Sequence, residues 1–497
     1  MGIMDFFKKA RRQQRLGRSY AASIVDRLTK DWTTTNRTAG AELKLALKPL
    51  RARSRELSRN NDYARRFLKM VGSNVVGPTG IKLQVRAREP DGRLDKFANR
   101  HIEENFIKWG KPGVCTMDGK MSWTEAQRMM VESVARDGEI IIRMVKGAAA
   151  ANEFGFALQF LEADHLDESL NQSLPNGRRI EMSVEFDAWR RPVAYHFLDK
   201  HPGEDFYSLG GRTYTRVPAE QILHPFIIER PDQPRGVPWM SSAMLRLQML
   251  GGYEEAEVVA ARIGASKMGF FTSPDSDSYE GGGEDADSNL TMELEPGVFE
   301  QLPSGVSVQT FDPDHPAGQF GDFMKTCLRG IASGLNVCYT GLANDLEGVN
   351  FSSIRQGTIE ERDHWRVLQR WSIEHFHAPV FESWLVSFLS SGMTTLPMRR
   401  FDKFNVPVWS PRGWQWVDPL KEVNANIAAV GAGFKSKSEV AAEQGRDLEE
   451  IFDALAAEQE LAEAKGIDLK DEGKGDENGG ENGKNNKDPE ADEDGDN

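Results

Sequence analysis

A long helix without a single apolar face is the feature that most constrains this 497-residue chain. The helix is expected over residues 241–268, directly after the rigid turn Gln233–Pro238, and would be about 42 Å long. Its larger apolar side chains do not line up on one stripe, and Gly251 and Gly252 at its middle favour a bend. A helix of this kind suits side-by-side packing against identical neighbours better than burial in one core. We therefore expect copies of the chain to assemble.

Two later segments carry helix-start signals. The segment Asn350–Arg355 follows a glycine-containing loop, and one of its two serines is predicted to cap a long helix over 352–389. The segment Trp416–Glu422 places an N-cap Asp before a Pro at the first helical position, with a Glu in the first turn. Pro379 should kink the long helix, because proline removes one backbone donor and clashes with the preceding turn.

The first 235 residues mix helical and strand patterns. Apolar residues over 41–71 recur at helical spacing, and a capping box of Ser122 and Glu125 predicts a helix over 121–135. Strand patterns follow one another at 81–85, 139–143, 156–161, 179–186 and 191–195. This mixture predicts an α+β fold with a mixed or antiparallel sheet.

The net charge of −14 hides an uneven distribution. Residues 1–70 hold 18 Lys and Arg against 6 Asp and Glu, whereas residues 471–497 hold 11 acidic residues against 3 Lys. We expect a flexible basic arm over 1–40 and a disordered acidic tail from 468 onward, because both lack apolar patterning. The body between the two ends carries about −18 and is too acidic for a general nucleic-acid binder, so any duplex that it handles would be held loosely.

No catalytic, cofactor or metal motif is found. The sequence lacks the phosphate loop of ATP motors, the nucleophile elbow and the paired-histidine zinc motif. The three cysteines have no metal-ligand spacing, and the histidines at 364, 375 and 377 and the acidic residues at 360, 361 and 363 are expected to be ordinary polar groups of one helix. No apolar run is long enough to cross a membrane. We therefore expect no enzyme activity, no cofactor, no metal and no membrane partner.

Arg51, Arg55 and Arg59 recur every four residues along a predicted helix and form a basic stripe. Two interpretations stay open at this point. The stripe is either a solvated helix face or a contact with DNA or with an acidic partner subunit.

Nearly the whole chain, from about residue 50 to residue 469, resembles the lambda-type phage portal proteins. The resemblance rests first on Asn350–Arg355 followed by Trp416–Glu422, in that order and at that separation. Shorter strings agree with it in the same order: Arg59–Ala64, Val75–Gly77, Asp137–Glu139, Leu158–Glu162, His224–Pro225, Gln233–Gly236, Ser333–Leu335 and Ala441–Gly445. The acidic tail and a polar loop over 273–290 depart from the family pattern and leave the partner contacts open.

The resemblance implies a portal-type α+β fold that assembles as a ring, usually a dodecamer. Its parts would be the arm over 1–40, a wing over 41–235, a stem helix over 236–271, a clip over 272–318, a second stem helix over 319–340, a tunnel loop over 341–351, a long kinked helix and further wing over 352–415, crown helices over 416–467 and the acidic tail over 468–497.

The resemblance also implies a function, namely a DNA channel at one capsid vertex of a virion, assembled in the host cytoplasm. A separate terminase would pump double-stranded DNA through it, and the other partners would be scaffold, major capsid and head–tail connector proteins. The loop residues Asn344, Asp345, Glu347 and Asn350 would line the channel, where the two carboxylates form a negative ring that repels phosphate. A nuclease or other DNA-processing enzyme, and a subunit of a different large ring assembly, remain as alternatives.

Overall fold

The computed structural model of the chain has two compact units, residues 1–408 and residues 409–497. The residues that the structure describes are 27, 29–204, 212–265, 269–272, 307–310, 320–347, 351–414, 419–444 and 448–466. Most of the predicted basic arm, the polar loop over 273–290, the predicted Asp cap at 418 and the predicted acidic tail lie outside the described residues.

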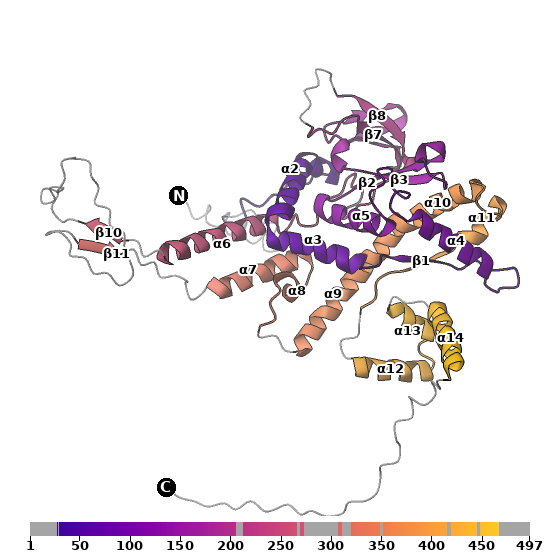
Figure 1. The fold of residues 1–497 in the computed structure, drawn as a ribbon. Coiled ribbons are helices and arrows are strands. Elements are labelled where there is room, and N and C mark those ends of the chain that lie inside the picture. The colour runs from indigo at the N-terminus through magenta and orange to yellow at the C-terminus, as the bar shows by residue number, and fades with distance from the viewer. Residues whose placement is uncertain are drawn as a thin grey trace, which may run out of the picture. The chain divides into compact units, whose positions relative to one another are not determined.

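The first unit combines helices with antiparallel strands, so the predicted α+β fold class is confirmed (Figure 1). Its helices are α2 (Ala39–Asn60), α3 (Asp62–Val75), α4 (Lys96–Trp109), α5 (Trp123–Asp137), α6 (Met244–Ala265), α7 (Phe320–Leu335), α8 (Tyr339–Ala343), α9 (Phe351–Ser372), α10 (Ala378–Ser390) and α11 (Phe401–Phe404). Its strands are β1 (Lys82–Val85), β2 (Ile141–Lys146), β3 (Phe156–Leu161), β4 (Gln172–Ser173), β5 (Arg179–Glu181), β6 (Val184–Phe186), β7 (Pro192–Leu198), β8 (Tyr214–Pro218), β9 (Ile222–Leu223), β10 (Gly269–Thr272) and β11 (Ser307–Thr310), and β12 (Pro407–Ser410) follows at its end.

Two antiparallel sheets carry the strands between residues 141 and 223. One has the order β3-β2-β9 and the other has the order β4-β5-β6-β7-β8. The single strand predicted over 179–186 is wrong, because the chain reverses there into the β5–β6 hairpin. Met182 and Ser183 form its two-residue turn with positive φ of 47° and 69°, a conformation that sequence patterns do not assign to methionine.

Aromatic side chains fill the core between α4, α5 and α10. Trp109, Trp384 and Phe381 are fully buried, and the Trp109 indole donates a hydrogen bond of 2.9 Å to the carbonyl of Phe156 in β3. The α5 helix begins as its sequence predicts, since the capping box of Ser122 and Glu125 is present in both directions. Local signals and long-range packing agree in this part of the chain.

The long helix after residue 350 differs from its prediction in two details. It begins at Phe351, so Ser352 and Ser353 lie in its first turn and the predicted serine cap is wrong. A π-helical turn, Ile373–His377, separates α9 from α10 just before Pro379, and the amide of Ala378 donates to the carbonyl five residues back. This wider turn makes room for the proline ring, so the helix continues through Pro379.

The α6 helix is the predicted long helix without one apolar face. It starts at Met244 rather than at residue 241, it runs unbroken through its two central glycines, and residues 266–268 lie outside the described part. Leu247 and Leu250 in its first half are buried, whereas Val258 and Val259 in its second half are exposed. Leu245 and Met249 in the first half are exposed as well, so the chain covers only one side of the first half and leaves apolar side chains of both halves uncovered.

The second unit contains the helices α12 (Pro419–Gly431), α13 (Lys437–Glu443) and α14 (Leu448–Lys465). Ser436 and Glu439 form a capping box at the start of α13. Among the described residues, no helix is long and apolar enough to cross a membrane.

Candidate functional site

Three segments of the first unit converge on the buried carboxylate of Glu139. Its oxygens accept hydrogen bonds from Arg51 at 2.8 Å, from Arg235 at 2.9 Å, from the His224 ring at 2.8 Å and from the backbone amide of Gly236 at 2.9 Å. The Glu139 and Arg235 side chains have no exposed surface, and Arg51 is 1% exposed. We call Glu139, Arg51, Arg235 and His224 the ion cluster.

The ion cluster joins elements that are far apart in the sequence. Arg51 lies on α2, Glu139 precedes β2, His224 follows β9, and Arg235 lies in the turn before α6. The Arg235 guanidinium also donates to the carbonyls of Ala163, Leu166 and Met182, so one side chain ties the β5–β6 turn to the segment that leads into α6.

Two glycines allow the backbone to close around the ion cluster. A Cβ on Gly236 would overlap the carbonyl of Gly138, and a Cβ on Gly138 would overlap the backbone of Val237. Gly138 also has a φ of 90°, which terminates α5 in the left-handed region. No side chain fits at either position without displacing main chain.

The electrostatics of the ion cluster keep Glu139 ionised and His224 neutral. Burial by itself would raise the pKa of Glu139, but the charge of Arg235, the contact with His224 and the charge of Arg51 outweigh it and hold that pKa well below its usual range. Burial lowers the pKa of His224 by more than the adjacent carboxylate raises it. The neutral imidazole therefore donates its Nε2 proton to Glu139.

The predicted basic stripe is divided by the fold. Arg51 is buried and also contacts Glu168 at 2.8 Å, while Arg55 is partly buried and pairs with Asp137 at 2.8 Å and with Asp164 at 2.6 Å. Only Arg59 is exposed. The expectation of one stripe on the surface is therefore wrong for Arg51 and Arg55, because carboxylates of the same chain already bind both guanidinium groups.

The segment after α8 holds the predicted tunnel-loop residues. Residues 341–343 belong to α8, so the loop begins at Asn344, which ends the helix with a φ of 54°. The Tyr339 hydroxyl donates to Asp345 at 2.6 Å, and Lys325 on α7 pairs with Glu347 at 3.2 Å. Both predicted carboxylates thus have partners in the chain. Asn350 lies outside the described residues.

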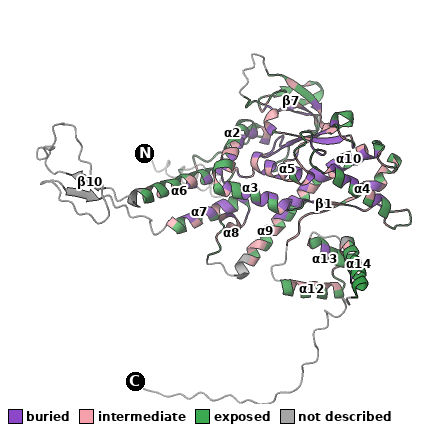
Figure 2. Ribbon diagram, in the orientation of Figure 1, coloured by how far each residue is buried: buried purple, intermediate pink, exposed green. Residues whose placement is uncertain are grey.

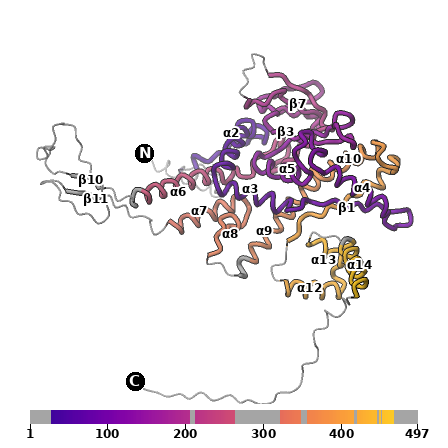
Figure 3. The backbone as a smooth tube through the Cα atoms, in the orientation of Figure 1, coloured from indigo at the N-terminus to yellow at the C-terminus, as the bar shows by residue number. Residues whose placement is uncertain are grey.

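The base of this loop is fixed to the first unit. Leu342 is buried, and the Arg66 side chain on α3 donates to the carbonyl of Gly341 at 3.2 Å. On α9, Gln369 donates to the carbonyl of Asn74 at the end of α3 at 3.0 Å. Early and late segments of the chain therefore lie side by side here, as the colours of Figure 3 show.

The Asp345 carboxylate in the loop stays charged, because the hydrogen bonds from the Tyr339 hydroxyl and from the backbone amide of Glu347 lower its pKa.

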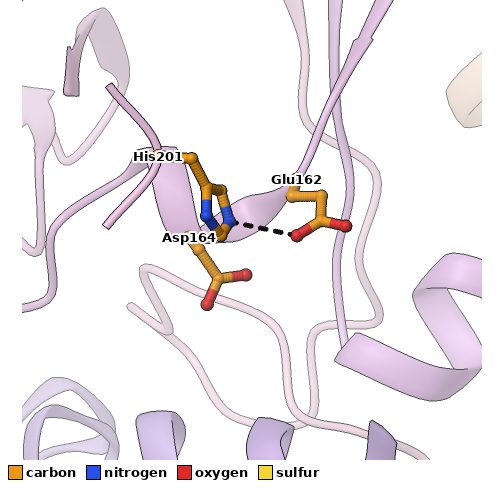
Figure 4. Close-up of side chains that lie close together, drawn as sticks. All are labelled: Glu162, Asp164 and His201. Carbon is orange, nitrogen blue, oxygen red and sulfur yellow. Dashed lines mark ion pairs between the residues drawn. The ribbon is translucent and has the colours of Figure 1, made fainter. Parts of the chain in front are cut away.

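One group of possible metal ligands occurs among the described residues, Glu162, Asp164 and His201 (Figure 4). The His201 ring lies 3.1 Å from the Glu162 carboxylate, and Asp164 faces Arg55 at 2.6 Å. A cation would have to compete with that guanidinium for Asp164, so the donor set fits a structural ion-pair network better than a metal site.

The polar groups considered for catalysis on α9 and on the π-helical turn that follows it are dispersed. Asp363 pairs with Arg366 at 2.6 Å, Glu360 accepts from Gln356 at 2.8 Å, and burial raises the pKa of Glu361. The histidines at 375 and 377 contact main-chain carbonyls of their own helix. Within the described part of the chain these groups do not converge on one point.

The family model and the relatives found by sequence agree on one family. Residues 25–369 match the model of the phage portal proteins of the lambda family. A probable portal protein of Halomonas phage phiHAP-1 is 35% identical over 453 residues, which are 90% of this chain and 87% of that protein. Portal protein B of Escherichia phage lambda is 20% identical over 467 residues, covering 85% of each chain. A chain from the neck of a native gene transfer agent particle is 14% identical with a TM-score of 0.41, over 79% of this chain and 93% of that one.

Proposed function

This chain belongs to the lambda family of phage portal proteins, and we propose that it forms the ring-shaped DNA channel at one vertex of a capsid. The observation that carries the proposal is the family match over residues 25–369, together with the 35% identical relative that spans 90% of the chain. The fold agrees with it, since the chain leaves apolar side chains on the second half of α6 uncovered. Identical copies arranged head to tail would cover them.

The parts of the chain take their proposed places in such a ring from the family. Helices α6 and α7 form the stem. Residues 41–235 form the wing, to which residues 352–415 add the long helix and a further part, and α12 to α14 form the crown. Tyr253 on α6 packs edge-on against Phe323 on α7 with ring centroids 5.0 Å apart, so the two stem helices are joined within one copy. The ion cluster then fixes the wing to the beginning of the stem, because Arg235 lies in the turn that leads into α6.

The loop that begins at Asn344 is proposed to line the channel. Asp345 stays charged, and Glu347 adds a carboxylate that Lys325 neutralises only in part, since the Glu347 side chain is 82% exposed. Repeated around a ring, these groups would present negative charge to a duplex and keep its phosphates from binding tightly. Asn350 belongs to the same proposal, on the family pattern alone.

The partners follow from the family in the same way. A terminase would supply the ATP-driven packaging, scaffold and major capsid proteins would surround the ring in the virion, and connector proteins would join it to the tail. The chain would assemble in the host cytoplasm, usually as a dodecamer. Arg59, the exposed member of the predicted stripe, remains available for DNA or for a neighbouring subunit.

The rival function, a nuclease or other DNA-processing enzyme, has no specific observation in its favour. It needs carboxylates that converge on a metal, and within the described residues the acidic groups of α9 are dispersed. Purified protein should therefore show no divalent-metal-dependent cleavage of DNA.

Mass photometry of the purified chain tests the assembly. The proposal predicts one dominant species with the mass of a closed ring of about twelve copies. Monomers or dimers alone, at every protein concentration and also with scaffold protein present, would contradict it.

A further inference from the structure

The second unit has almost no apolar core of its own among its described residues. Only Ala441 and Ala462 are buried there, and Figure 2 shows its helices mainly as exposed or intermediate. Large apolar side chains lie on the surface instead: Leu420, Ile427, Phe434, Phe452, Leu455 and Leu461. Short helices gain most of their stability from packing an apolar face, so these helices need a covering surface.

Apolar residues of α12 and α14 that the unit does not bury form two separate faces. On α12, Leu420, Val423, Ile427 and Val430 recur at helical spacing; Leu420 and Ile427 are exposed, and the two valines are half-buried. We call these four residues the α12 stripe. On α14, Phe452 and Leu455 lie three residues apart on one side of the helix, and we call them the α14 face.

Charge helps to identify what covers these faces. Beside the α14 face, α14 exposes Asp453, Glu458, Glu460 and Glu463. This acidic surface disfavours DNA, because phosphate binding needs clustered Lys and Arg. The α12 helix carries one Lys and one Glu, so its stripe can approach α14 without adding net negative charge.

We propose that the α12 stripe of one copy packs against the α14 face of the next copy, so that the second unit completes its core only on assembly. A head-to-tail contact needs two different faces that cover each other, and this unit presents two. Each copy would offer α12 to one neighbour and α14 to the other, and a closed ring would leave neither face uncovered. The inference rests on the ring assembly proposed above and names the residues of one contact within it.

Disulfide cross-linking tests this contact in the full-length ring. A disulfide forms only where two Cβ atoms come within about 4 Å. The double variant Ile427→Cys, Leu455→Cys therefore reports whether position 427 of one copy lies that close to position 455 of the next. On oxidation, a denaturing gel should show a ladder of covalently linked copies. The matched control, Ile427→Cys with Ala457→Cys, places the second thiol on the other side of α14 and should give no ladder, like the wild-type chain with its three native cysteines.

Each outcome of the cross-linking decides between the proposals. An intact ring that gives no ladder, or only a cross-linked single chain, overturns the inference and leaves the proposed function standing. Wild-type protein that forms no ring overturns both. Limited proteolysis of the wild-type chain provides a second measurement in case the cysteine variant fails to assemble. Residues 419–466 should be cleaved in dissociated monomers and protected in rings. Equal protection in both states would contradict the inference.

Discussion

Glu139→Gln should strongly destabilise the first unit. Glutamine keeps the size of the side chain, but it removes the charge and replaces one acceptor oxygen by a donor that faces other donors. Arg51 keeps Glu168 at 2.8 Å, whereas Arg235 is left with main-chain carbonyls as its other partners. Removing one partner of a buried ion pair costs about 3–5 kcal/mol, and we expect a loss of that size.

Chemical denaturation of the wild-type chain and of the variant at equal protein concentration measures this loss, because assembly shifts apparent stability with concentration. Glu162→Gln is the matched control. The Glu162 side chain is 55% exposed beside Arg55, so its loss should cost less than about 1 kcal/mol. If Glu139→Gln also costs less than about 1 kcal/mol, the reasoning about an uncompensated buried arginine is refuted.

Folding lowers the pKa of both His224 and Glu139, so the unfolded state binds more protons in acid. Stability that is present at neutral pH should therefore be lost as pH falls below about 6.5, where the unfolded histidine protonates, and further below about 4.5, where the unfolded glutamate does. Urea titrations across this pH range measure the loss, and constant stability would contradict the prediction. Gly236→Ala should lower the free energy of unfolding by about 1–3 kcal/mol in thermal unfolding, because the added Cβ would overlap the carbonyl of Gly138. An unchanged stability would refute the close approach of these two backbone segments. Deletion of residues 343–348 should leave the ring intact in mass photometry, because buried Leu342 remains, but should impair retention of packaged DNA; loss of the ring would make this segment structural.

Local sequence signals predicted the elements that depend on neighbouring residues. The capping box of Ser122 and Glu125 and the α+β mixture are examples, and both are present in the structure. The β5–β6 turn was missed because Met182 and Ser183 rarely adopt positive φ, and contacts from Arg235 and from the Asp167 carbonyl hold that turn in place.

The ion cluster could not be predicted from local patterns. Arg51 and Glu139 are 88 residues apart, and Arg235 and Glu139 are 96 residues apart, so helical spacing alone made Arg51 look like part of a surface stripe. One signal was nevertheless visible, since Asp137–Glu139, His224–Pro225 and Gln233–Gly236 are among the strings that resemble the portal family. In the fold these three strings meet around one carboxylate.

Electron microscopy of the purified full-length chain tests the central claim most directly. Averaged end-on images should show a closed ring of identical subunits around an open channel wide enough for a DNA duplex. Compact monomers or dimers, or a ring without such a channel, would contradict the account.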